Sequence, residues 1–221
     1  MHRLLAAFFL LISVVSCAPH HQVGYEPEYA EDGFTRQKIA IIPVFDDSNP
    51  NLEWNVSYEL TQEIRDKIKR DNHFFLLDED QTFRKVLRTR HMSLDEMVDL
   101  IWPVFGRADY VILLELIQHD VLAYERESHP EICTREDFCC NNTLQQKIRI
   151  SVLNVQWRPK KLILEEMITL SSTIPKECEF WDYRSFGLGS VYYPETPIAK
   201  AHQHLAERVA EYIETVIWSL K

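Results

Sequence analysis

The residues of this chain whose types and spacing could do chemistry include two adjacent aspartates and a pair of histidines. Asp46 and Asp47 follow an apolar stretch, and the carboxyl end of a strand is where α/β sheets often bind ligands. Paired carboxylates there could bind a cation, although a loop or cap role is the commoner use of aspartate. His202 and His204 lie two positions apart in a helical stretch, which turns their imidazoles to different faces. We therefore expect solvent-facing histidines rather than a shared metal.

The sequence contains no catalytic or nucleotide-binding motif. It lacks G-x-S-x-G, H-E-x-x-H, a P-loop and G-x-G-x-x-G. Gly187 and Gly189 follow no strand–helix junction, so we interpret them as part of a turn. We expect no enzymatic activity, no cofactor and no metal.

Four cysteines lie in polar stretches of the second half of the chain: Cys133, Cys139, Cys140 and Cys178. An even number of cysteines in an exported chain indicates disulfides. A bridge between the neighbours Cys139 and Cys140 would be strained, so we expect one of them to pair with Cys178 and the other with Cys133. The alternative is a zinc site that includes His129, but the C-x2-C pairs typical of zinc sites are missing.

The fifth cysteine, Cys17, ends an amino-terminal stretch that has the features of an export signal. A basic start with Arg3 precedes an apolar run over residues 4–15, which is short of the roughly 20 residues of a spanning helix. Residues 14–17, Val-Val-Ser-Cys, resemble the lipobox of bacterial lipoproteins, where a signal peptidase cuts before the cysteine and lipid is attached to it. An ordinary secretory signal would have an A-x-A-like site, but bulky Val14 stands at its first position.

The lipobox resemblance implies a domain organisation. Residues 1–16 are then a signal peptide, and acyl chains on Cys17 anchor the protein permanently. Ala18 stands where aspartate would retain a lipoprotein in the inner membrane, which implies the outer membrane, with the domain facing the periplasm. Residues 17–37 form the lipidated cysteine and a flexible tether, because they lack periodicity and hold prolines, glycines and acids. One domain occupies residues 38–221.

The charge of the chain limits its partners. The formal net charge is −10, from 24 Lys and Arg against 34 Asp and Glu. This balance argues against nucleic acid and against electrostatic adhesion to an anionic membrane. The membrane attachment that remains is lipid on Cys17.

The elements that must position these residues follow from hydrophobic periodicity. Five stretches have the apolar or alternating pattern of strands: 38–45, 73–78, 108–124, 144–157 and 162–174. Helical periodicity marks 52–70, 79–92, a stretch that begins at Ser93, and a carboxyl-terminal stretch opened by Thr196 and Pro197. The first two strands flank a helix, which predicts that they are parallel, and the last two form an antiparallel hairpin. The pattern predicts an α/β fold: one mixed sheet of about five strands with amphipathic helices packed on it, ending in a long carboxyl-terminal helix.

Two stretches carry a resemblance to known domains. Residues 38–45, K-I-A-I-I-P-V-F, resemble an opening I-A-V-L-P-F strand, and residues 106–112, G-R-A-D-Y-V-I, resemble G-A-D-Y-V before a central strand. The domain is similar in this to the penicillin-binding-protein activator lipoprotein, the curli secretion lipoprotein and the TolB amino-terminal domain. The long amphipathic helix and the strand at residues 73–78 match as well. The resemblance covers roughly residues 38–120, and loosely the hairpin beyond, and it carries no functional residue. It departs at Leu114-Glu115-Leu116, where these relatives have glycine, and in the cysteine-rich stretch.

Aromatic side chains gather between Cys178 and Thr196: Phe180, Trp181, Tyr183, Phe186, Tyr192 and Tyr193. Such a segment either packs on the domain or forms a partner-binding surface, and we favour packing because a disulfide at Cys178 would hold it. The sequence thus predicts a lipid-anchored lipoprotein whose periplasmic domain binds an envelope protein without chemistry of its own, in cell-envelope assembly or regulation. The alternatives are a periplasmic enzyme or small-ligand binder with a pocket beside Asp46, Asp47 and the aromatic segment, and a subunit of an outer-membrane secretion assembly.

Overall fold

One mixed β-sheet carries the architecture of the protein in the computed structural model, which describes residues 35–48, 54–78, 105–123, 141–156, 161–176 and 182–220. Its strands are β1 (Lys38–Ile41), β2 (Phe45–Asp46), β3 (Phe75–Leu76), β4 (Tyr110–Leu122), β5 (Asn141–Asn154) and β6 (Lys161–Pro175). The order is β3-β1-β4-β5-β6, with β2 also paired to β4. The expected signal peptide, the expected tether up to residue 34, and the helices expected at 79–92 and from Ser93 lie outside the described residues.

The strand directions agree with the prediction. β1 is parallel to β3 and to β4, as a strand–helix–strand unit requires, while β4, β5 and β6 are successively antiparallel. Pro43 lies between β1 and β2, where the missing N–H interrupts pairing with β4 before β2 resumes it. The sheet is therefore one six-stranded mixed sheet, two strands of which are only two residues long.

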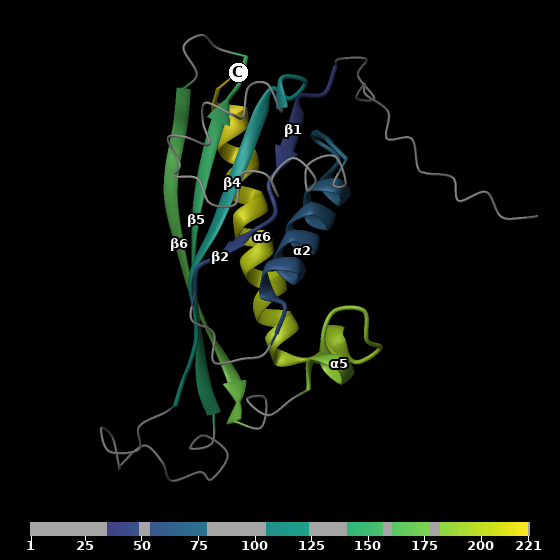
Figure 1. Ribbon diagram of the computed structural model, residues 1–221, viewed down its shortest axis with the longest axis vertical. Helices are drawn as coiled ribbons and strands as arrows, with labels where there is room; N and C mark the ends of the chain where they lie inside the picture. The colour runs from purple at the N-terminus through teal and green to yellow at the C-terminus, as the bar shows by residue number, and fades with distance from the viewer. Residues whose placement is uncertain are drawn as a thin grey trace, which may run out of the picture.

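Two long helices lie side by side on one face of the sheet, α2 (Val56–Asp71) and α6 (Pro197–Ser219) (Figure 1). Both begin at a side-chain cap: Asn55 accepts from Tyr58 N–H, and Thr196 accepts from Ala199 N–H. The main core fills the space between these helices and the sheet. Its fully buried side chains include Leu60, Ile64, Ile148 and Leu205.

A second, smaller core cluster, which contains Ile42, Val111 and Leu153, forms on the opposite face of the sheet from the main one. Strand neighbours alternate between the clusters: Ile39 and Ile41 belong to the main core, and Ala40 and Ile42 to the smaller one. Of the helices in the described residues, none combines the length and apolar character that crossing a bilayer requires.

Residues 182–196, which precede α6, lie at the end of this helix opposite the carboxyl terminus (Figure 1). They contain a short helix, α5 (Tyr183–Phe186), and a single 3-10 turn, η3 (Tyr193–Glu195). We call residues 182–196 the aromatic segment. Its place at the amino-terminal ends of both long helices brings it over the polar residues described next.

Candidate functional site

Asp46 and Asp47 have local roles in the structure. The carboxylate of Asp46 accepts hydrogen bonds from the backbone N–H and the hydroxyl of Ser48, at 3.1 and 2.6 Å. The backbone N–H of Asp47 donates to Leu116 O, and both side chains are exposed. Within the described ranges, no hydrogen bond or ion pair joins either aspartate to the aromatic segment, and no group of three or more His, Cys, Asp or Glu side chains is arranged to hold a metal ion.

The aromatic segment divides into buried and exposed side chains. Tyr193 is 3 % exposed and belongs to the main core, and the half-buried Tyr183 and Phe186 pack against that core. Tyr192 is 66 % exposed and Val191 89 %, and Phe186 contacts the ring of Tyr192 at 6.1 Å between centroids. The segment is thus packed on the domain at one side and open on the other. Phe180 and Trp181 lie outside the described residues, as do Cys17, Cys133, Cys139, Cys140 and Cys178.

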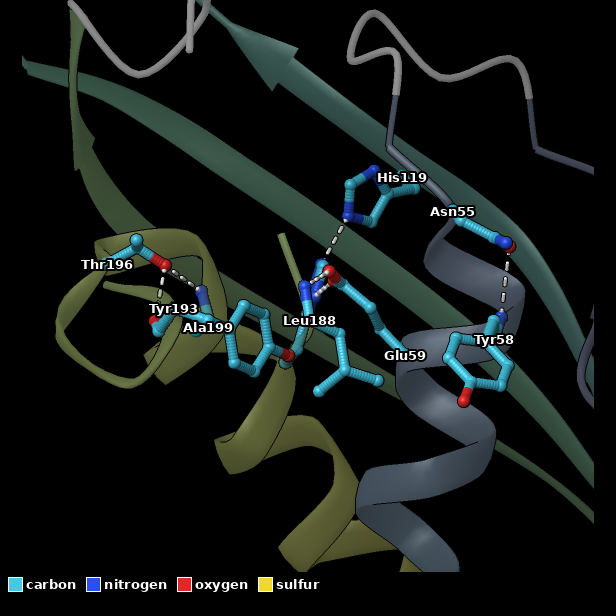
Figure 2. A network of polar contacts seen from close by, with 9 residues as sticks. Asn55, Tyr58, Glu59, His119, Leu188, Tyr193, Thr196 and Ala199 are labelled. Atoms are coloured by element: carbon cyan, nitrogen blue, oxygen red, sulfur yellow. Dashed lines mark hydrogen bonds and ion pairs between the residues drawn. The ribbon is translucent and has the colours of Figure 1, made fainter. Parts of the chain in front are cut away.

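Beneath the aromatic segment lies a polar network that the sequence did not reveal. Glu59 on α2, His202 on α6 and His119 on β4 are all fully buried, at 0 % exposure. Glu59 Oε2 is 2.7 Å from His202 Nδ1, and His202 Nε2 is 2.9 Å from His119 Nε2. We call these three side chains the Glu–His–His network; Figure 2 shows Glu59 reaching from α2 toward the side on which His119 lies.

His202 corrects a sequence prediction. It was expected to face solvent, but it is buried, and only His204 is exposed. The spacing argument was right that the two imidazoles point to different faces. It missed that position 202 is four residues after Ile198 and three before Leu205, and so belongs to the buried stripe of α6.

A β-bulge puts His119 into the network. The pairing of β4 with β5 shifts register between Leu116 and Gln118. Before the bulge, Leu114 and Leu116 face the core. The extra residue shifts the alternation of side chains by one position, so that His119 and Val121 face the core after it. Without the bulge, position 119 would lie on the other face of the sheet.

The geometry of the histidine pair is that of a direct hydrogen bond. The ring centroids are 5.1 Å apart. With 2.9 Å between the two Nε2 atoms, this is close to the separation expected when both Nε2 atoms lie on the line that joins the ring centres. Two imidazoles that bound one metal would instead point their lone pairs at a common third position. With Glu59 ionised, His202 Nδ1 carries a proton and donates it, and one further proton is shared between the two Nε2 atoms.

The electrostatics of the network follow from its burial. Burial, and then the charge on His202, lower the pKa of His119 to about 3, so His119 is neutral near pH 7. Its Nδ1 and both polar atoms of the Gln146 side chain are buried and have no hydrogen-bond partner among the residues that the structure describes. Gln146 is the cross-strand partner of His119, so these atoms belong to neighbouring side chains on one face of the sheet.

The aromatic segment is joined to this network by polar and ring contacts. The backbone N–H of Leu188, in the glycine turn, donates to Glu59 Oε1 at 3.1 Å. Trp54 lies edge-on to both Tyr183 and His202, with centroids 5.5 and 6.4 Å apart. Burial and the nearby Glu59 carboxylate raise the pKa of Tyr183 to about 12, and burial with the same carboxylate raises the pKa of Tyr193 further. Both hydroxyls therefore stay protonated.

The fold and the network define the class of protein: an α/β fold with a mixed sheet, two helices on one face and a buried Glu–His–His network under a packed segment. The chain belongs to a family of unknown function, DUF7499, which matches residues 25–220. A search of curated proteins finds no match.

Solved structures share this fold. The hypothetical protein CT253 from Chlamydia trachomatis superposes with a TM-score of 0.61 at 16% identity, covering 83% of this chain and 98% of that one. The lipoprotein GNA1162 from Neisseria meningitidis gives 0.44 at 7% identity, with 62% and 83% covered. The LpoB C-terminal domain from Salmonella enterica gives 0.36 at 13% identity, with 63% and 86% covered. The similarity to CT253 shows the fold, whereas the TM-scores of the other two structures are too low to support an argument.

Proposed function

We propose that this protein is an outer-membrane lipoprotein, anchored through Cys17, whose periplasmic domain binds another envelope protein and does no chemistry of its own. The observation that carries the binding role is an exposed apolar group held on a rigid base. Val191 and Tyr192 are 89 and 66 % exposed, and Tyr58, which is close enough to Tyr183 of the same segment to affect its pKa, is 50 % exposed. We call Tyr58, Val191 and Tyr192 the aromatic surface. Aromatic side chains are enriched where proteins bind one another.

The aromatic surface is preorganised by the contacts below it. Tyr193, next to Tyr192, is buried in the main core, and Leu188 is tied to Glu59. Tyr58 follows the α2 cap and precedes Glu59 directly in the sequence. A surface that needs no ordering on binding loses less conformational entropy, which favours association.

A binding role also fits the burial of the two histidines of the network. The residues with the chemistry of a general acid or base, Glu59, His202 and His119, are each 0 % exposed. A substrate would have to reach them through the aromatic segment, so the arrangement as it stands supports structure rather than catalysis.

Site-specific photo-crosslinking in cells tests the binding role. A photoreactive residue replaces Tyr192 in one variant and Trp218 in a matched control, because Trp218 is similarly exposed, at 51 %, near the opposite end of α6. We expect one discrete envelope protein to be crosslinked from position 192 and not from 218. The same products from both positions, or none from either, would refute the proposal.

Labelling with a palmitate analogue tests the anchor separately. We expect the natural chain to take up label and to sediment with the outer membrane, and Cys17→Ser to do neither. Label on Cys17→Ser would contradict attachment at this residue.

A further inference from the structure

The Glu–His–His network connects the core to the aromatic segment through a single carboxylate. Oε2 of Glu59 contacts His202 on α6, and Oε1 accepts the backbone N–H of Leu188. The side chain therefore fastens α2 to α6 and to the turn that precedes Val191 and Tyr192. Both contacts depend on Glu59 accepting hydrogen bonds, which it does best as a carboxylate.

Titratable groups from each element packed here surround or belong to the network. From α2 comes Glu63, which lies near His202 and whose pKa is raised by burial. The tyrosines Tyr183 and Tyr193 come from the aromatic segment, His119 from β4 and His202 from α6. Within the described residues, the one ion pair that Glu59 makes is with His202.

We propose that the Glu–His–His network is a proton-controlled latch, in which proton uptake below neutral pH releases the aromatic segment from α2. A proton on His119 puts a positive charge inside the core, with its Nε2 2.9 Å from the Nε2 of His202. This uptake disfavours the closed arrangement, so acid shifts the equilibrium toward an open segment that can solvate these groups.

The effect on partner binding rests on the proposed function, because it assumes that the aromatic surface is the binding site. The latch itself does not, since it concerns the attachment of Leu188 to Glu59. Acid is then expected to disorder Val191 and Tyr192 and to weaken the partner complex. The latch responds to proton uptake and needs no other ligand.

Amide hydrogen exchange on the full chain, resolved by NMR at the Leu188 amide, tests the latch without a partner or a lipid. After correction for intrinsic exchange, we expect Leu188 protection to fall at least about tenfold between pH 7.5 and 5, because one linked proton gives up to tenfold per pH unit. The β5 and β6 amides should keep their protection. Unchanged protection at Leu188, or an equal loss throughout the sheet, would overturn the proposal.

Two variants separate the latch from general acid sensitivity. His119→Leu removes the imidazole that takes up a proton when the segment opens, so we expect a much smaller pH response at Leu188. His204→Gln changes an exposed histidine two positions from His202 and should respond like the natural chain. If His119→Leu does not fold, the natural chain still decides, because the exchange comparison across pH and the titration of the His119 ring signals use it alone. Ring signals that titrate as in free histidine would contradict the latch.

Discussion

His119 Nε2 lies 2.9 Å from His202 Nε2, although the two residues are 83 positions apart in the chain. A bulge in β4 and the apolar stripe of α6 bring them together. Because Glu59 contacts the other nitrogen of His202, a strand and two helices meet through three polar side chains in an apolar core. Removing one partner leaves the others buried without compensation, which gives the first prediction.

Glu59→Gln should destabilise the protein by about 2 kcal/mol, because it leaves the buried His202 without a counter-charge. The measurement is urea unfolding at pH 7. The matched control is Glu211→Gln, which removes an exposed ion pair to Arg208 in which both side chains are 58% exposed. The control should change stability by no more than about 0.5 kcal/mol. Losses of equal size in the two variants would show that the network contributes nothing special.

The free energy of unfolding should fall when the pH is lowered from 6.5 toward 3. The pKa of His119 drops from an ordinary 6.5 to about 3 on folding, so in this window the unfolded chain takes up a proton that the native chain does not. The contribution of His119 is complete above pH 6.5 and is lost as the pH approaches 3, with a slope of at most about 1.4 kcal/mol per pH unit. The raised pKa of Glu63 acts with the opposite sign, since its contribution is complete at low pH and is lost as the pH rises.

Urea unfolding at several pH values measures this slope. In His119→Leu the dependence between pH 6.5 and 4 should become shallower, although the variant is less stable at pH 7 because His202 loses a partner. His204→Gln keeps the slope, since His204 is exposed. An unchanged slope in His119→Leu would exclude this residue as its source.

The fold could be predicted because its main elements are locally encoded. The antiparallel pair β5 and β6 alternates over many residues, and α6 begins at a Thr-Pro cap that the sequence displays. The parallel pairing of β1 and β3 followed from the helix between them. These features need only periodicity and cap chemistry, both of which are properties of short stretches.

The Glu–His–His network could not be predicted, because each member is buried for a reason outside its own neighbourhood. His119 faces inward only because a bulge shifts the register against β5, and nothing in the stretch itself marks the bulge. Glu59 is acidic on a helix whose apolar stripe runs through Val56 and Leu60. Only for His202 could burial have been predicted from the sequence, because position 202 lies on the apolar stripe of α6.

Thr196→Ala should destabilise the protein by about 1–2 kcal/mol, because Thr196 is a buried helix cap. Its hydroxyl accepts from Ala199 N–H and donates to Tyr193 O, at 3.0 and 2.9 Å. It thereby joins the start of α6 to η3. Thr215→Ala is the control: its exposed hydroxyl donates to Glu211 O within the helix, where alanine has the higher helix propensity, so little or no loss is expected. Thermal unfolding compares the two, and equal shifts in Tm would refute the cap.

The disulfide prediction can be sharpened by the register of the hairpin. Asn141 and Pro175 are cross-strand partners, and Cys140 precedes the first while Cys178 follows the second by three residues. Since a residue spans at most about 3.3–3.6 Å of chain, Cys140 and Cys178 can reach bonding distance without disturbing β5 or β6.

We expect peptide mapping of the natural protein under non-reducing conditions to find Cys178 linked to Cys139 or Cys140, and the remaining one of these linked to Cys133. Cys178→Ser should lower Tm, because the loop closed by the bridge no longer restricts the unfolded chain. Free thiols at all four positions in protein taken from the envelope would contradict the pairing.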